Sequence, residues 1–268
     1  MNWKPAIRKK DLLKTLLVAV SLIIVIAWLQ YAPPGLLGKM DAVGYAVCHR
    51  IEARSFHLGE RSIPLCARCS GMHLGALLGL AFQTLWGRKG KLPPLKIMLV
   101  LGVFLVAFGV DGVNSYLHFF PNLPSLYEPN NTLRLITGTG LGLGIAAIIY
   151  PIFNQTIWSD WEDQPILGGW KELGALLGLA ILLDLMILSE NPLLLYPLAV
   201  LSGLNVLIIL GICYTLIIIL MFKQENAFTT WRSLWVPLVA GLTVAVLQTY
   251  LVDVLRFTFT GTWGGFNL

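Results

Sequence analysis

The chain has 268 residues, of which 56 % are hydrophobic and only 12 % are charged. Because a soluble domain usually carries about 25 % charged residues, this composition excludes a water-soluble globule, and the apolar content excludes a disordered chain. Four cysteines are too few for a disulfide-dense secreted scaffold. The apolar runs are long and continuous instead of alternating, so we predict an all-α, polytopic helical membrane protein and not a β-barrel.

Seven apolar runs approach the roughly 20 residues that a membrane-spanning helix needs. They cover residues 12–32, 70–86, 97–120, 133–153, 173–188, 193–222 and 234–255. We interpret the first as a retained anchor, because its apolar run is too long for a signal peptide. Glycines recur at four-residue spacing at Gly71, Gly75 and Gly79, and again at Gly174 and Gly178. This spacing favours close packing between helices.

The distribution of Lys and Arg predicts the orientation of these spans. With a cytoplasmic N-terminus, twelve of the 19 basic residues fall in inner segments and seven in outer ones. We therefore expect a multi-pass protein of the cell membrane with a cytoplasmic N-terminus and an extracytoplasmic C-terminus. The net charge of +5 then reflects topology, and we expect no nucleic-acid partner.

Residues 48–73 contain three of the four cysteines and three of the four histidines. Thiolate and imidazole side chains around a C-x-x-C motif suit a tetrahedral zinc ion. Cys66, Cys69 and His73 share one face if a helix starts near Cys66. Cys48 would complete the set from the preceding segment, and His49 competes with His73 as the fourth ligand.

Two other chemistries fit the same cysteines. A C-x-x-C motif with a lowered thiol pKa supports thiol–disulfide exchange, with Cys48 as the resolving cysteine. Alternatively, Cys66 or Cys69 forms a structural disulfide with Cys48. Cys213 stands alone in an apolar run and is expected to behave as a small buried hydrophobe.

The basic residues of this region have two interpretations. Guanidinium groups pair bidentately with phosphate or carboxylate, so they would bind an anionic lipid or small solute. Alternatively, they extend to lipid phosphates at the membrane interface. The candidate anion-binding residues are Arg50, Arg54, Arg61 and Arg68.

Ionisable residues inside membrane spans are costly and are usually paired or functional. Three polar residues lie toward the same side of the membrane, near the end of the third span and the start of the fourth. They are the candidate catalytic residues of a polar pocket: Asp111, Asn114 and Arg134. We expect Asp111 to pair with Arg134 across one short connection. The same two residues would lie in the path of a small-solute transporter or channel, which is a further possible function.

The segments Cys-His-Arg at 48–50, Arg-Ser-Phe at 54–56 and Pro-Leu-Cys-Ala-Arg-Cys-Ser-Gly at 64–71 form one block. A second block comprises Asp-Gly at 111–112 and Leu-Arg-Leu-Ile-Thr-Gly at 133–138. Together they resemble a family of uncharacterised prokaryotic membrane proteins over residues 45–145. The resemblance implies a helical membrane domain without a settled activity. It also implies an aromatic residue where this chain has His73, which favours His49 as the fourth ligand.

These observations combine into one expected organisation. An anchor and the start of an outer segment occupy residues 1–44, the family-like membrane domain 45–154, and further membrane helices 155–268. We expect a zinc site on the extracytoplasmic face, next to the polar pocket, in a protein embedded in the lipid bilayer. Its expected ligands are Cys48, His49, Cys66 and Cys69.

Overall fold

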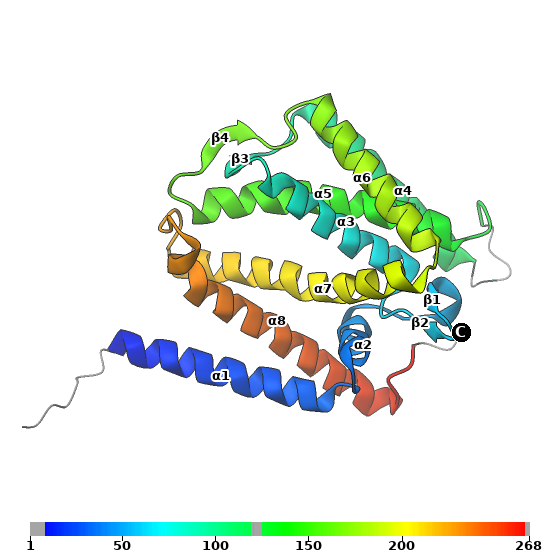
Figure 1. The fold of residues 1–268 in the computed structure, drawn as a ribbon, viewed down its shortest axis with the longest axis horizontal. Helices are drawn as coiled ribbons and strands as arrows, with labels where there is room; N and C mark the ends of the chain where they lie inside the picture. Colours follow the sequence, from blue (N-terminus) through cyan, green and yellow to red (C-terminus); the bar gives the residue numbers. More distant parts are fainter. Residues whose placement is uncertain (1–8, 119, 121–124, 266–268) are drawn as a thin grey trace, which may run out of the picture.

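The computed structural model describes residues 9–118, 120 and 125–265, most of which are helical (Figure 1). The described part contains eight α-helices, one 3-10 helix and four short strands. The helices are α1 (Lys9–Tyr31), α2 (Leu36–Val47), α3 (Ala67–Thr84), α4 (Leu95–Leu117), α5 (Asn131–Ile157), α6 (Trp170–Leu188), α7 (Pro192–Met221) and α8 (Trp231–Thr260). The remaining elements are η1 (Glu52–Arg54), β1 (His57–Leu58), β2 (Arg61–Ser62), β3 (Lys89–Lys91) and β4 (Glu162–Pro165).

Each of the seven expected spans coincides with a helix, which confirms the all-α fold class. Five helices, α1, α4, α5, α7 and α8, are long and apolar enough to cross a membrane. The count of seven was therefore approximate, because α3 and α6 are shorter and carry charged residues. The sequence reading missed α2, whose 12 residues are too few for a span. Phe119, at the end of the third expected span, lies outside the described residues.

The packing of α3 against α5 depends on glycine. A Cβ atom at Gly75 would lie 2.4 Å from the backbone oxygen of Thr139, and one at Gly142 would lie 2.2 Å from that of Met72. The two helix backbones are therefore in direct contact, as the spacing of glycines in α3 predicts. The same interpretation was wrong for Gly174 and Gly178 of α6, because a Cβ at either would meet nothing within 4 Å.

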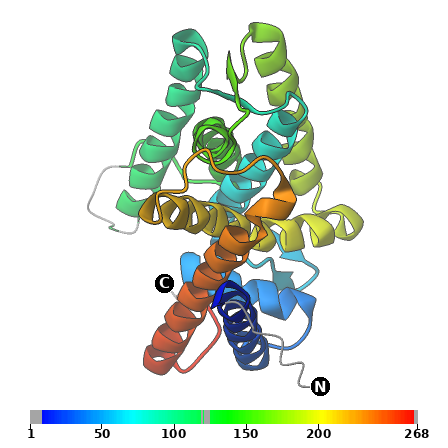
Figure 2. The same cartoon turned by 90° about the vertical axis from the view of Figure 1, so that its left-hand side faces the viewer.

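The remaining helices are arranged on both sides of this pair. In Figure 2, α7 crosses the middle of the molecule, with α8 and α1 below it and α4 and α6 above. Helix α1 packs mainly on α8 and leaves much of its apolar surface exposed. Such a surface suits contact with lipid acyl chains.

The short elements gather at two opposite ends of the bundle. Strand β3 lies in the connection from α3 to α4, and strand β4 in the connection from α5 to α6. The two strands pair in parallel at one end of the bundle (Figure 1). Helix α2, η1 and the β1–β2 hairpin lie at the other end, near the end of α8. We call this second end the cysteine end, because Cys48, Cys66 and Cys69 lie there.

Candidate metal centre

The local structure around α2 and α3 brings the three cysteines together. Cys48 ends α2, where its backbone N–H donates to the carbonyl of Gly44 over 2.8 Å, and Cys66 is the residue that precedes α3. A Cβ atom at Gly44 would lie 2.0 Å from the backbone oxygen of Pro64. Glycine at this position thus lets the end of α2 press against the segment that leads into α3, which places Cys48 beside Cys66.

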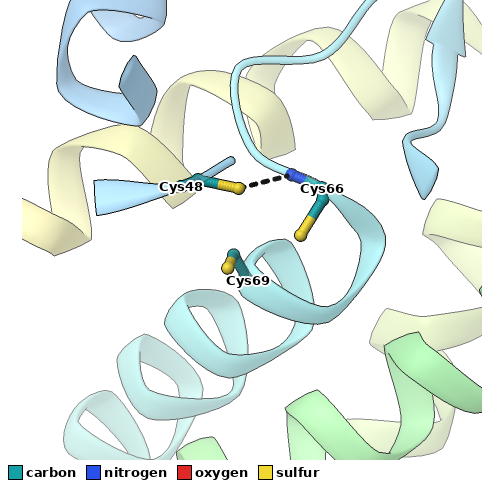
Figure 3. A group of neighbouring side chains, drawn as sticks. All are labelled: Cys48, Cys66 and Cys69. Carbon is teal, nitrogen blue, oxygen red and sulfur yellow. Dashed lines mark hydrogen bonds between the residues drawn. The ribbon is translucent and has the colours of Figure 1, made fainter. Parts of the chain in front are cut away.

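The three sulfur atoms form one compact group. The Sγ atoms of Cys48, Cys66 and Cys69 all lie within 4.8 Å of one another, and the side chains converge in Figure 3. Cys48 and Cys66 are buried, Cys69 is partly exposed, and all are free thiols. The disulfide between Cys48 and Cys66 or Cys69 that we considered is therefore not formed here. Cys213 lies apart, in α7.

The surroundings of Cys48 favour its thiolate form. The backbone N–H groups of Cys66 and Arg50 point to its sulfur at 3.5 and 3.4 Å. Hydrogen bonds from the thiols of Cys66 and Cys69 are the main cause that lowers the pKa of Cys48 well below its usual range. The same hydrogen bond to Cys48 raises the pKa of Cys66 to about 12. The hydrogen bonds that converge on its sulfur therefore favour ionisation of Cys48 over that of Cys66.

Two histidines lie near the sulfurs without joining their group. The Nδ1 atom of His49 is 3.6 Å from the Sγ atom of Cys48. His73 is buried in α3, and its Nδ1 atom has no hydrogen-bond partner among the described residues. Neither imidazole belongs to the set of ligand atoms within 4.8 Å of one another. The identity of a fourth ligand therefore stays a prediction.

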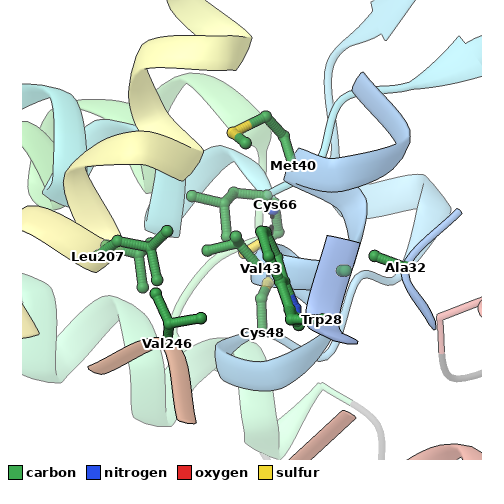
Figure 4. Close-up of a cluster of buried hydrophobic side chains, with 11 residues drawn as sticks. Trp28, Ala32, Met40, Val43, Cys48, Cys66, Leu207 and Val246 are labelled. Carbon is green, nitrogen blue, oxygen red and sulfur yellow. Dashed lines mark hydrogen bonds between the residues drawn. The ribbon is translucent and has the colours of Figure 1, made fainter. Parts of the chain in front are cut away.

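An apolar cluster encloses the sulfurs. Trp28 of α1, Leu207 of α7 and Val246 of α8 pack together with Cys48 and Cys66 (Figure 4). Arg256 of α8 donates to the backbone carbonyl of Cys48 over 2.8 Å. Helices from both ends of the chain therefore shield Cys48 and Cys66 from water.

Arg50 and Arg61 form ion pairs with Asp41 of α2, an acidic residue that the sequence reading missed. The Arg50–Asp41 distance is 2.8 Å, and Arg50 also donates to the carbonyl of Trp263 at 2.8 Å. Arg50 has a left-handed backbone with φ of 52°, a conformation that non-glycine residues seldom adopt. A cavity of about 790 Å³ lies beside this pair. No sequence motif marks Asp41, because its role depends on the fold of α2 against residues 50–61.

The polar pocket differs in its pairing from the expectation. The expected pair of Asp111 with Arg134 was wrong, because the carboxylate of Asp111 forms its ion pair with Arg68 and accepts from the Tyr127 hydroxyl at 2.9 Å. Arg134 donates to the side chain of Asn131 at 2.9 Å. Arg68 precedes Asp111 by 43 residues. The sequence alone therefore does not indicate this pair, which becomes visible only when α3 and α4 are placed in the fold.

Asn114 has a structural role in this pocket. Its side chain accepts from the backbone N–H of Leu126 at 2.6 Å and donates to the carbonyl of Tyr127 at 2.8 Å. The amide thus replaces two backbone partners and holds the segment before α5 against α4. Tyr127, which reaches Asp111, is a second pocket residue that the sequence reading missed.

Residues 48–148 match the family described as "Predicted membrane protein (DUF2085)". An uncharacterised protein of Methanocaldococcus jannaschii is 31 % identical over 122 residues, which make up 45 % of this chain and 72 % of the relative. The chain belongs to this family.

A second relative, an uncharacterised protein of Methanothermobacter thermautotrophicus, is 31 % identical over 102 residues, or 38 % of this chain and 83 % of the relative. No solved structure matches the chain. Membership in the DUF2085 family confirms the resemblance and supports the assignment of a membrane protein embedded in a lipid bilayer.

Proposed function

We propose that this DUF2085 protein is a metal-binding membrane protein, with a zinc ion held by Cys48, Cys66 and Cys69 and with His49 as the fourth ligand. The observation that carries the proposal is the convergence of three sulfurs within 4.8 Å of one another. Sulfurs around a tetrahedral zinc ion lie about 3.8 Å apart, since each Zn–S bond measures about 2.3 Å. A contraction of about 1 Å or less would therefore bring these sulfurs to the spacing of a zinc site.

Burial and charge favour a metal over three neutral thiols. Backbone N–H groups already donate to the sulfur of Cys48, as they do to anionic acceptors. Deprotonated thiols this close together and shielded by apolar side chains would repel one another, and a divalent cation offsets that repulsion. Among divalent ions, zinc prefers thiolate and imidazole ligands in tetrahedral sites.

The metal would join two parts of the chain. Cys48 directly follows α2, whereas Cys66 directly precedes α3 and Cys69 lies in its first turn, with η1 and the β1–β2 hairpin in between. A closed four-ligand site would fix this segment as a cap over the pocket of Asp111, Asn114 and Arg134. His49 is the best-placed fourth ligand, because its Nδ1 atom lies 3.6 Å from the sulfur of Cys48.

Metal analysis of the purified full chain tests the proposal. We expect about one zinc per chain, loss of the metal in Cys48→Ser and Cys66→Ser, and full retention in the matched control Cys213→Ser. His49→Ala should bind zinc more weakly than His73→Ala. Absence of stoichiometric metal in the unmodified protein, or its retention in Cys66→Ser, would refute the proposal.

The thiol–disulfide alternative gives a different result in an alkylation experiment. Cysteines that bind zinc become available to a maleimide reagent when a chelator is added, without any reductant. Cysteines that cycle through a disulfide become available only after reduction. A reductant-dependent change confined to Cys48, Cys66 and Cys69 would replace the metal proposal with the oxidoreductase.

We also propose that the cysteine end faces away from the cytoplasm. Its basic residues weaken the sequence argument for this orientation, but several have structural roles. Arg50 and Arg61 pair with Asp41, Arg68 pairs with Asp111, and Arg256 binds backbone carbonyls. Basic residues used in this way need not report topology. Labelling of a single cysteine introduced at Ser125 in intact cells tests the orientation.

A further inference from the structure

Three guanidinium groups lie close together where η1, α3, α4 and α5 meet. Arg54 of η1 donates to the backbone carbonyl of Ser115 at 3.0 Å, and Arg68 of α3 donates to the hydroxyl of the same residue at 3.0 Å. Asn131 accepts from Arg134 of α5 at 2.9 Å. The side-chain nitrogen of Asn131 donates to the two backbone carbonyls that flank Arg54, each over 3.4 Å. We call this set the arginine cluster.

Positive charge prevails in the arginine cluster. Arg68 forms the ion pair with Asp111, whereas the contact of Arg134 is with a neutral amide. Within the described part of the chain, Asp111 provides the salt bridge of this cluster. Burial and then the charges of Arg134 and Arg68 lower the pKa of Arg54 to about 10, which still leaves it protonated at neutral pH.

Arg134 has unused capacity to donate. Only 6 % of the surface of Arg134 is exposed. Its Nε–H group has no acceptor within the described part of the chain. Burying a guanidinium with an unsatisfied donor is costly, and an anion relieves both its charge and its missing hydrogen bond. Arg54 and Arg68 are partly exposed, so a ligand can approach the cluster from their side.

We propose that Arg54, Arg68 and Arg134 bind a phosphate group at the cysteine end. A phosphate offers several oxygen acceptors to several guanidinium donors, and arginine pairs with it bidentately. The hydroxyl of Tyr127 donates to the carboxylate of Asp111, which also pairs with Arg68. Both oxygens of this carboxylate therefore already have partners. The inference goes beyond the metal centre and does not depend on it.

The structure also separates this cluster from the other two arginines of the cysteine end. Arg50 and Arg61 share the carboxylate of Asp41, so two positive charges meet one negative charge there, and Glu52 lines the same cavity. Of the four arginines that the sequence nominates as anion ligands, Arg54 and Arg68 therefore belong to the phosphate site, together with Arg134.

The test has two arms that distinguish the source of the phosphate. In the first, inorganic phosphate is titrated into the purified full chain in phosphatidylcholine nanodiscs, and binding heat is measured. In the second, native mass spectrometry measures phosphatidylglycerol that stays bound when the protein is released from mixed nanodiscs. Saturable binding in the first arm indicates a soluble phosphate ligand, and binding in the second arm alone indicates a lipid headgroup.

The variants connect either signal to the cluster. We expect Arg54→Gln and Arg134→Gln to weaken binding at least tenfold, which corresponds to about 1.4 kcal/mol at 25 °C. Arg61→Gln is the matched control and should stay within about twofold, because Arg61 pairs with Asp41. Arg54→Lys keeps the charge but loses the bidentate geometry, so its loss should be intermediate.

Three results would overturn the phosphate site: no saturable binding in either arm, unchanged binding in Arg54→Gln, or an equal loss in Arg61→Gln. If Arg134→Gln does not yield a monodisperse protein, the half-buried Arg54 carries the test with its two substitutions. Zinc content measured on the same samples separates failure of this inference from failure of the metal proposal.

Discussion

Substitution of Gly75 by alanine tests whether the contact of α3 with α5 holds the protein together. A Cβ atom at this position would lie 2.4 Å from the backbone oxygen of Thr139 and 2.9 Å from its Cα atom. Ordinary contact begins at about 3.4 Å, so the helices must separate by about 1 Å. The atoms in the way belong to the backbone and cannot rotate aside. Overpacking of this kind costs about 1–3 kcal/mol.

The matched control is Gly144→Ala on α5, where a Cβ atom would meet nothing within 4 Å. Both substitutions replace glycine in a helix by alanine, which by itself favours the helix by about 1 kcal/mol. The difference between the two variants therefore isolates the steric clash. We expect Gly75→Ala to have a free energy of unfolding about 1–3 kcal/mol lower than that of Gly144→Ala.

Reversible unfolding in mixed micelles, followed by tryptophan fluorescence over increasing SDS, measures this difference. If Gly75→Ala unfolds at the same SDS fraction as Gly144→Ala, the backbones of α3 and α5 are not in contact and the packing described here is wrong. The result also bears on both proposed sites, because α3 carries Cys69 and Arg68 whereas α5 carries Arg134.

Three further predictions use the same unfolding assay. Asp111→Ala should lower the free energy of unfolding by about 3–5 kcal/mol, because it leaves the Arg68 guanidinium without its ion-pair partner; a loss below about 1 kcal/mol would contradict this. Trp28→Phe should cost about 1–3 kcal/mol, since the Trp28 indole donates to the buried carboxylate of Asp253 at 3.0 Å, and adding Asp253→Leu should recover part of the loss. A zinc chelator should lower the stability of the unmodified protein but not of Cys48→Ser, and equal sensitivity would argue against a bound metal.

The sequence by itself determined the class of the protein and the place of its chemistry. Long apolar runs at low charge leave helices in a bilayer as the stable arrangement, because every backbone polar group must bond internally there. Each of the seven apolar runs coincides with a helix, and five of these helices are long and apolar enough to cross a membrane. The cysteines of residues 48–69 could be nominated because polar, metal-ligating residues are rare in such a chain.

Pairing between distant residues was decided by the tertiary structure alone. Hydropathy along a chain carries no information about which buried acid meets which arginine, so Asp111 was assigned to Arg134 and Asp41 was overlooked. The Arg68–Asp111 pair joins α3 to α4, and the position of α3 depends on its close contact with α5, which the glycines of both helices allow. Asp41 meets its arginines where α2 lies against residues 50–61. The meeting of Cys48 with Cys66 depends likewise on the close approach of Gly44 to Pro64, which no local pattern in the sequence reveals.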